Sequence, residues 1–364
     1  MKSYFKDYGE TSFITGMRAF AALGVILTHA GGGGLHALGH IAGTLSDFGR
    51  TGVFVFFVIS GFSVAYSYTS CNNYFEYLNK RIWRIAPLYY FYLVATIAIG
   101  ATSVFWQETF HLVGISKYNF LLHIAFLSFL DYRVANSIIG VEWSIPIEVF
   151  WYFIVPLLLL LSNTNKKLLY LIIFSFFAYN ISKIPAKLSL FDNAALAIHW
   201  SPLPYIFSYS LGIAAFMLRN KVQHTNLSGN IAFIFSVIIT LVHVLLPGIT
   251  KKLFLDELTI ISIATAIMIT YGSRNSSLFK SFFCNSLMQK TGTLSYGIYL
   301  CHIPVMTIMT RYNLCSTNAT INFFVFALVS TILSFFTYIS IEKYGNLIGK
   351  KTFEALRQAE RPFS

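Results

Sequence analysis

The fold of this chain is decided by an apolar segment that reads Arg18-Ala-Phe-Ala-Ala-Leu-Gly-Val-Ile-Leu-Thr-His29. Ten uncharged residues separate the arginine from the histidine. On an α-helix, eleven steps turn through roughly three whole turns and rise about 16 Å, so Arg18 and His29 share one stripe. A cation and an imidazole inside an apolar helix are costly in lipid, and such residues usually mark a functional site.

The composition of the whole chain is that of a polytopic membrane protein. Of its 364 residues, 56% are hydrophobic and 11% are charged, whereas soluble domains carry about 25% charged residues. The net charge of +12 is spread over short loops between apolar runs. Because basic loops of this kind set membrane topology, the expected surroundings are a lipid bilayer, and nucleic acid is not an expected partner.

Ten apolar segments are long enough to cross a bilayer, which takes about 17–25 residues. They lie near residues 14–31, 50–69, 86–105, 145–162, 166–182, 203–218, 229–247, 256–272, 294–311 and 320–341. An eleventh apolar piece, over residues 119–130, is too short to span comfortably. We expect it to be re-entrant or interfacial.

The distribution of basic residues predicts that both termini are cytoplasmic. With ten spans, 17 basic residues lie on the inner side and 8 on the outer side, which is the expected excess of Lys and Arg in the cytoplasm. If residues 119–130 also crossed, the downstream loops would change sides and reverse this excess. We therefore predict an all-α protein with a membrane domain over residues 1–345 and a short basic cytoplasmic tail over 346–364.

The loop after the first predicted span contains glycines at 31–34, followed by His36 and His40. No Gly-Lys-Ser/Thr sequence follows the glycines, so a flexible turn is expected here and not a phosphate-binding loop. Two histidines four residues apart would need further ligands to hold a metal. No metal site is predicted.

The fourth predicted span begins with a second group of candidates, Glu142-Trp143-Ser144-Ile-Pro-Ile-Glu148. Glu148 is expected about one turn below the outer surface, at a depth like that of His29, with Ser144 one turn above it. A carboxylate there can orient an imidazole and raise its basicity, although an ion pair or a water-facing helix end is also possible. Trp143 fits either an interfacial belt or a platform for a sugar ring.

Two residue pairs complete the candidates. Arg81 and Arg84, just before the third span, would face one way on a helix. Two guanidinium groups suit phosphate, but basic residues at this place also serve as topology signals. Tyr299 and His302, three apart in the ninth span, would form either a helix-packing hydrogen bond or a contact with substrate.

Several of these motifs together resemble the acyltransferase-3 family of membrane O-acyltransferases. Each motif is weak alone, but they occur in the family's order and cover nearly the whole chain. The set comprises Arg18-x10-His29, Gly-Arg-Thr-Gly-Val at 49–53, Phe-Phe-Val-Ile-Ser-Gly-Phe at 56–62, Arg81-x2-Arg84-Ile-Ala-Pro, Trp143-Ser144-Ile with Glu148, Ser-Tyr-Gly-Ile-Tyr-Leu-Cys-His at 295–302, and Ile-Glu-Lys at 341–343.

The resemblance implies an integral enzyme of the bacterial inner membrane with about ten helices. Such an enzyme passes an acyl group, usually acetyl, from cytoplasmic acyl-CoA to a hydroxyl of a cell-envelope glycan. It needs acetyl-CoA as co-substrate and no tightly bound cofactor. The chain looks like the stand-alone form, without a C-terminal esterase-like domain. A sugar of lipopolysaccharide O-antigen or capsule is the expected acceptor, with peptidoglycan, a lipid-linked oligosaccharide or a secreted metabolite as alternatives.

The residues and the resemblance lead to one mechanistic hypothesis. Arg81, Arg84 and Arg18 hold the CoA phosphates near the inner face, and the pantetheine arm carries the thioester towards His29. His29, oriented by Glu148, removes the proton from the sugar hydroxyl, or carries the acyl group itself as an acyl-histidine. The residues expected to contact the acceptor are Trp143, Ser144, Tyr299 and His302.

A membrane transporter or permease is the competing function, because buried Arg, His and Glu side chains also line ion pathways. Inverted repeats of the transporter kind are not detectable in the sequence. A sensor or structural membrane protein is a third possibility, in which His29 would have no part in glycan chemistry. The ordered motif set favours the enzyme.

Overall fold

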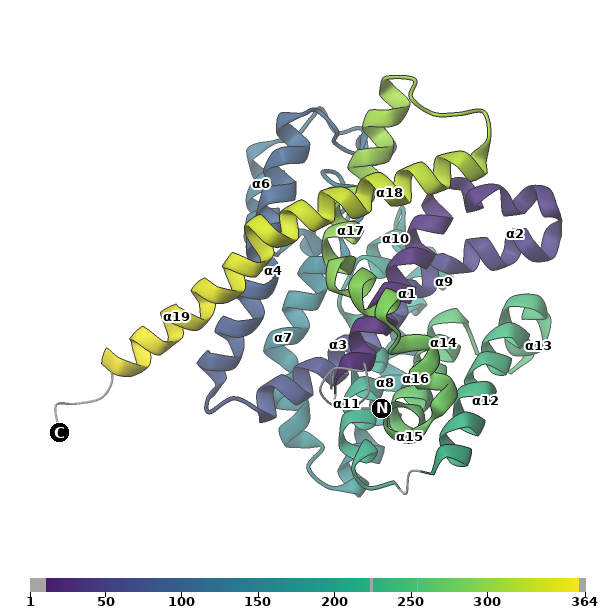
Figure 1. The fold of residues 1–364 in the computed structure, drawn as a ribbon, viewed down its shortest axis with the longest axis vertical. Helices are drawn as coiled ribbons and strands as arrows, with labels where there is room; N and C mark the ends of the chain where they lie inside the picture. Colours follow the sequence, from purple (N-terminus) through teal and green to yellow (C-terminus); the bar gives the residue numbers. More distant parts are fainter. Residues whose placement is uncertain (1–10, 223–224, 254, 360–364) are drawn as a thin grey trace, which may run out of the picture. The chain divides into compact units, whose positions relative to one another are not determined.

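The structure is a computed structural model that describes residues 11–222, 225–253 and 255–359. Within these residues every regular element is a helix and there is no β-strand (Figure 1). The prediction of an all-α protein is therefore confirmed. Residues 360–364 of the predicted tail, and the chain before residue 11, lie outside the described residues.

The helices fall into long and short ones. The long helices are α1 (Ser12–His29), α3 (Gly52–Thr69), α4 (Tyr74–Ala98), α7 (Ser144–Leu161), α8 (Asn165–Ser182), α11 (Ile206–Arg219), α12 (Asn226–Leu245), α14 (Glu257–Ile267), α17 (Ser286–Arg311), α18 (Ala319–Thr337) and α19 (Lys343–Ala359). The short ones are η1 (Gly31–Leu38), α2 (His40–Asp47), η2 (Phe48–Thr51), α5 (Val104–Thr109), α6 (Lys117–Ile124), η3 (Ser128–Leu130), α9 (Ile184–Lys187), α10 (Ala194–His199), η4 (Leu203–Tyr205), α13 (Pro247–Lys252), η5 (Met268–Gly272), α15 (Ser273–Asn275), α16 (Ser277–Phe283) and η6 (Tyr338–Glu342).

Six helices of the described chain are long and apolar enough to cross a membrane. They are Ser12–His29, His40–Thr69, Ser144–Leu161, Asn165–Lys187, Asn226–Leu245 and Ala319–Gly349. Helices of this length and composition indicate an integral membrane protein. The count of ten spans and the cytoplasmic position of both termini stay predictions.

The short apolar piece at residues 119–130 is broken into two short helices, α6 and η3. Helix α6 has 8 residues, which corresponds to a length of about 12 Å. It is followed by Phe126 with φ of 55° and by the three residues of η3. A bilayer core is about 30 Å thick, so this segment does not cross it as one helix, in agreement with the sequence.

The chain divides into two compact units. Among the described residues, the first contains those within 11–63, 207–296 and 318–324, and the second contains those within 64–206, 297–317 and 325–359. Arg18 and His29 therefore belong to the first unit. The other predicted site residues belong to the second unit: Arg81, Arg84, Trp143, Ser144, Glu148, Tyr299 and His302.

Helix α1 is held in the first unit by close backbone contacts at glycines. A Cβ atom at Gly52 would collide with the carbonyl oxygen of Ala21, and one at Gly292 would collide with that of Thr15. Small residues allow membrane helices to approach closely and gain van der Waals contact. Helix α1, which carries the Arg–His pair, is thereby fixed against the start of α3 and the first half of α17.

In the second unit, α19 packs beside α4 (Figure 1). The Asn79 Nδ2 atom donates a hydrogen bond of 2.6 Å to the Gly349 carbonyl oxygen. A Cβ on Gly345 would lie 2.8 Å from the ring of Pro87, so the two helices are in close contact there as well. The segment predicted as a short tail thus continues as a helix, and its beginning is docked on the arginine-bearing helix.

Candidate active site

Arg18 and His29 lie on one unbroken α-helix, as their spacing predicts. Helix α1 runs from Ser12 to His29, and the Ala30 N–H closes its last turn on the Ile26 carbonyl oxygen at 2.8 Å. The eleven-residue step corresponds to about 16 Å along the axis and nearly three whole turns. Arg18 is half-buried and His29, at the end of the helix, is exposed.

The glycines after His29 form a left-handed turn. The φ angles at residues 31–34 are 66°, 70°, 58° and 83°, a region that is open to glycine and costly for other residues. The Thr320 hydroxyl fixes this turn by donating a 2.9 Å hydrogen bond to the Gly33 carbonyl oxygen. The four glycines therefore form a turn, as predicted, and its positive φ angles favour glycine at each of these positions.

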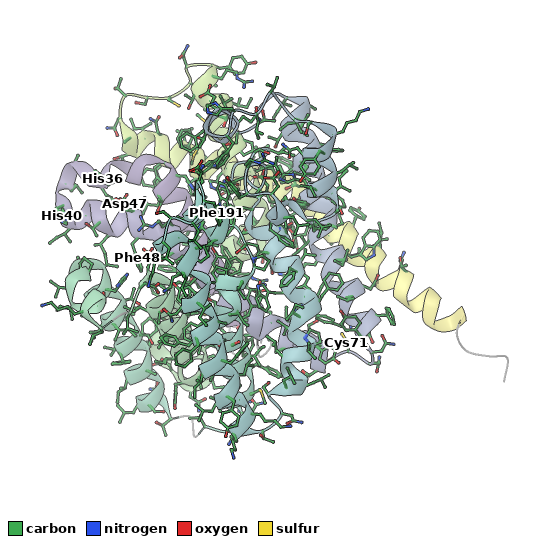
Figure 2. All side chains as sticks on the ribbon, turned by 180° about the vertical axis from the view of Figure 1, so that it is seen from behind. His36, His40, Asp47, Phe48, Cys71 and Phe191 are labelled. Carbon is green, nitrogen blue, oxygen red and sulfur yellow. The ribbon has the colours of Figure 1, made fainter. Side chains whose placement is uncertain are left out.

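The two histidines of this loop have separate surroundings (Figure 2). His36 Nε2 lies 3.0 Å from Asp47 Oδ1 and 3.3 Å from Ser46 Oγ, on a partly exposed hairpin made by η1 and α2. His40 is exposed at the beginning of α2. Among the described residues, no three His, Cys, Asp or Glu side chains are grouped so that they could hold a metal ion.

Glu148 is linked to Arg81 through Tyr152. The Tyr152 hydroxyl donates a 2.8 Å hydrogen bond to Glu148 Oε1, and the Arg81 guanidinium carbon lies 5.6 Å from the Tyr152 ring centroid. Tyr77, from the same helix as Arg81, donates a 2.8 Å hydrogen bond to the Tyr152 carbonyl oxygen. A cation over an aromatic face is stabilised by the ring's quadrupole, more strongly when water is excluded.

This arrangement differs from the sequence-based expectation for the two arginines. Both lie on α4, but Arg81 is only 6% exposed whereas Arg84 is exposed. Tyr152 contacts both Glu148, through its hydroxyl, and Arg81, through its ring. Arg81 is buried because its guanidinium lies against the face of the Tyr152 ring. A basic residue that only signals topology would have no need of such a contact.

The structure brings together two acceptor candidates from distant segments. Ser144 Oγ and Tyr299 Oη are 2.8 Å apart, although 155 residues separate them in sequence. The Tyr299 hydroxyl also donates a 2.8 Å hydrogen bond to the Val141 carbonyl oxygen. Both side chains are only 6% exposed. The N-terminus of α7 and the middle of α17 therefore meet at a pair of hydroxyl groups.

Trp143 and His302 are both buried. Trp143 is 8% exposed, and its ring centroid lies 4.7 Å from that of His199. An interfacial belt residue would face lipid, so this burial argues against that interpretation, while the sugar platform stays a prediction. His302 is fully buried, and its Nδ1 atom bonds to the Tyr299 carbonyl oxygen of its own helix at 2.7 Å. The His302 imidazole thus bonds within α17, and its contact with substrate stays a prediction.

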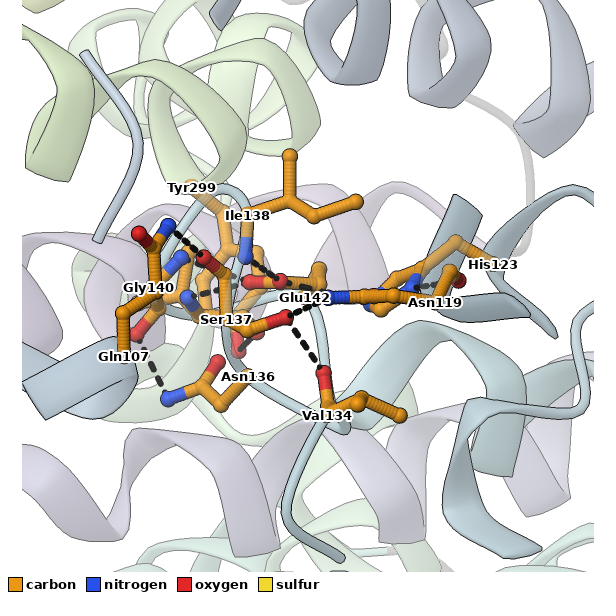
Figure 3. Close-up of polar contacts among 11 residues, drawn as sticks. Gln107, Asn119, His123, Val134, Asn136, Ser137, Ile138, Gly140, Glu142 and Tyr299 are labelled. Carbon is orange, nitrogen blue, oxygen red and sulfur yellow. Dashed lines mark hydrogen bonds and ion pairs between the residues drawn. The ribbon is translucent and has the colours of Figure 1, made fainter. Parts of the chain in front are cut away.

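Sequence reasoning missed a buried acid and its neighbour. Glu142 and His123 have no exposed side-chain surface, and their Oε1 and Nε2 atoms are 3.4 Å apart (Figure 3). A carboxylate directly before the Trp143-Ser144 pair was the available signal. No role could be assigned to Glu142 from the sequence, because its partners are backbone N–H groups of the preceding loop. A pattern of residue types does not reveal such partners.

Comparison with known proteins identifies the family. Residues 11–339 match a family model described as an acyltransferase domain, Acyl_transf_3. The chain belongs to the acyltransferase-3 family. The match covers both units and includes every predicted site residue, so the resemblance drawn from the motifs is confirmed.

Three relatives illustrate the range of similar proteins. "Putative acetyltransferase ORF330" of Acidianus two-tailed virus is 27% identical, over 80% of this chain and 82% of its own length. "Putative peptidoglycan O-acetyltransferase YrhL" of Bacillus subtilis (strain 168) is 24% identical, over 93% of this chain and 55% of its own length. "O-acetyltransferase OatA" of Staphylococcus aureus (strain MRSA252) is 24% identical, over 96% and 60% respectively. The chain thus spans little more than half of the latter two, and no solved structure matches it.

Proposed function

We propose that this chain is an O-acetyltransferase that moves an acetyl group from cytoplasmic acetyl-CoA to a hydroxyl of a cell-surface glycan. The observation that carries the proposal is the family match over residues 11–339 together with the Arg–His pair on one helix. Relatives named as O-acetyltransferases support the acetyl group and the oxygen ester. Family membership also disfavours the transporter alternative.

In the proposed reaction, His29 is the general base. It takes the proton from the sugar hydroxyl as the oxygen attacks the thioester carbonyl; the C–O bond forms, the C–S bond breaks, and the proton passes to the CoA thiolate. Glu148 supports His29, a role inferred from the sequence. An acyl-histidine relay, in which His29 first accepts the acetyl group, gives the same balance in two steps.

The donor is proposed to bind through arginines. Arg84 is exposed and can pair with phosphate oxygens as a bidentate donor. Arg81, buried over Tyr152, has a guanidinium that is already partly desolvated and is held in one orientation. Arg18, half-buried on α1, is the third arginine of the proposed donor site. CoA phosphates are the groups that three guanidinium forks would recognise.

The acceptor is proposed to bind at the hydroxyl pair of Ser144 and Tyr299, with Trp143 and His302 beside it. Buried hydroxyl groups that hydrogen-bond a sugar reject analogues that lack the hydroxyl, which suits a glycan. Lipopolysaccharide O-antigen or capsule is our first acceptor. Peptidoglycan is the second, because the name of the Bacillus subtilis relative YrhL contains it.

The proposal is tested with protein purified in detergent and reconstituted in liposomes, with radiolabelled acetyl-CoA as donor. Purified lipopolysaccharide, capsule and peptidoglycan are offered separately, and base-labile label on each glycan is counted. Label on one of these glycans, dependent on the protein, supports the proposal. Label on none of them, with acetyl-CoA intact, contradicts it.

A further inference from the structure

Glu142 lies in a cradle of backbone donors just before α7 (Figure 3). Its Oε1 atom accepts a 2.7 Å hydrogen bond from the Ile138 N–H. Its Oε2 atom accepts hydrogen bonds from the N–H groups of Gly140 at 2.6 Å and Val141 at 3.0 Å. A buried carboxylate with three N–H donors is well satisfied, because charge-assisted hydrogen bonds offset its desolvation.

His123 lies next to this carboxylate. Its Nδ1 atom lies 2.9 Å from the Asn119 carbonyl oxygen, which cannot donate, so Nδ1 carries a proton. Nε2 faces Glu142 Oε1 at 3.4 Å, a distance longer than most N–H···O bonds. Neither side chain has any exposed surface, so both are excluded from water.

Other side chains fix the same loop. The Asn119 amide donates to Ser137 Oγ at 2.8 Å, and the Gln107 amide donates to the Ser137 carbonyl oxygen at 3.0 Å. The Asn136 amide donates to the Gly140 carbonyl oxygen at 2.8 Å. The loop before α7 is therefore held by hydrogen bonds from α5, α6 and the loop itself, with Glu142 at the centre.

The loop held in this way determines the direction of the hydrogen bonds at the acceptor pair. Val141 gives its N–H to Glu142 and receives the Tyr299 hydroxyl proton on its carbonyl oxygen. A tyrosine hydroxyl has a single proton. Because that proton goes to Val141, the 2.8 Å contact between Ser144 and Tyr299 must use the proton of Ser144. The series of hydrogen bonds therefore runs from Ser144 to Tyr299 to Val141. Ser144 Oγ can still accept a hydrogen bond through its lone pairs.

We propose that Glu142 is a positioning residue for the acceptor, since it fixes the Val141 backbone and thereby makes Ser144 a hydrogen-bond acceptor for a sugar hydroxyl. This inference rests on the proposed function and deepens it by assigning the polarity of the acceptor site. A hydroxyl that donates to Ser144 has its oxygen lone pairs directed away from the serine. Because a hydroxyl has a single proton, the hydroxyl that donates to Ser144 orients the sugar, and a different hydroxyl gives its proton to His29 and is acylated.

A double-mutant cycle tests the proposal on the reconstituted enzyme. Glu142→Gln keeps the shape but loses one carboxylate acceptor, Tyr299→Phe removes the relay hydroxyl, and the third variant combines the two. The acceptor probes are purified lipopolysaccharide and peptidoglycan-derived disaccharide, whichever the wild type acetylates. Each single variant should raise KM for the acceptor about fivefold to tenfold, as expected for one hydrogen bond, with KM for acetyl-CoA unchanged. The double variant should resemble Tyr299→Phe alone, since Glu142 acts through that hydroxyl.

Controls separate positioning from folding. Glu108→Gln, at an exposed carboxylate of the same unit, should leave both KM values unchanged. Glu142→Asp, which is too short to reach all three N–H groups, should raise the acceptor KM in the same direction. Multiplicative effects in the double variant, an unchanged acceptor KM, or an equal rise in both KM values would overturn the proposal. So would failure of both Glu142 variants to fold, because Glu142 would then be a folding residue. A wild type without any transfer would refute the proposed function instead.

Discussion

Tyr152→Phe tests whether the hydrogen bond to Glu148 matters for catalysis. The change removes the hydroxyl that donates to Glu148 Oε1 at 2.8 Å and leaves the ring that faces Arg81. It also leaves the hydrogen bond from Tyr77, because that bond goes to the backbone of residue 152. The expected loss is therefore confined to one charge-assisted hydrogen bond.

The magnitude follows from that bond. A hydrogen bond to a charged group is worth about 1.5–3 kcal/mol, and the half-buried state of Glu148 reduces this to about 1–2 kcal/mol. If Glu148 supports the general base, the rate of acetyl transfer should fall by a factor of about 5–30. The apparent melting temperature in detergent should change little, because the ring and the backbone contact remain.

The assay is acetyl transfer from radiolabelled acetyl-CoA, normalised to the amount of monodisperse protein. Tyr77→Phe is the matched control, since it removes a buried hydroxyl of the same cluster that donates its hydrogen bond to the Tyr152 backbone and not to Glu148. It should lower thermal stability and leave kcat unchanged. Full activity of Tyr152→Phe would refute the role of this hydrogen bond, as would an equal loss of kcat in Tyr77→Phe.

Three further predictions concern packing, the donor and pH. Gly292→Val should lower the apparent melting temperature by roughly 5 °C or more, because its Cβ collides with the backbone of α1, whereas Gly248→Val, with no atom within 4 Å of its Cβ, should not. Arg84→Ala should raise KM for acetyl-CoA about tenfold and leave KM for the glycan unchanged. If the variant and the wild type had the same KM for acetyl-CoA, a phosphate-binding role of Arg84 would be refuted. Hydrogen bonds from Arg133 hold the pKa of Asp131 below its usual value, so this carboxylate stabilises the fold at neutral pH and the contribution is lost as pH falls below about 4. In thermal melts from pH 7 to 3, Asp131→Asn should show a smaller decline than the wild type, and an identical decline would contradict this pairing.

Local features of the fold were predictable from the sequence. The unbroken helix under Arg18 and His29 follows from apolar composition and spacing within 18 residues. The short length of α6 likewise follows from the brief apolar run at 119–130. In both cases the deciding interactions lie within one segment, where helix geometry and hydrophobic length suffice.

Features that depend on tertiary packing were not predictable. Arg81 was indistinguishable from a topology signal, because its burial requires the face of Tyr152 on another helix. The contact between Ser144 and Tyr299 joins positions 155 residues apart. A local sequence pattern cannot reveal a contact between residues so far apart in the chain. Glu142 was visible as a carboxylate, but its backbone donors become neighbours only when the loop before α7 folds around it.

The central claim is that the acyl group reaches its acceptor at His29. The most direct measurement compares His29→Ala with His40→Ala, an exposed histidine in the same unit, in liposomes with radiolabelled acetyl-CoA outside and glycan inside. Our account predicts that His29→Ala binds acetyl-CoA but places no label on glycan, while His40→Ala matches the wild type. Labelled glycan at near wild-type rates in His29→Ala would contradict it.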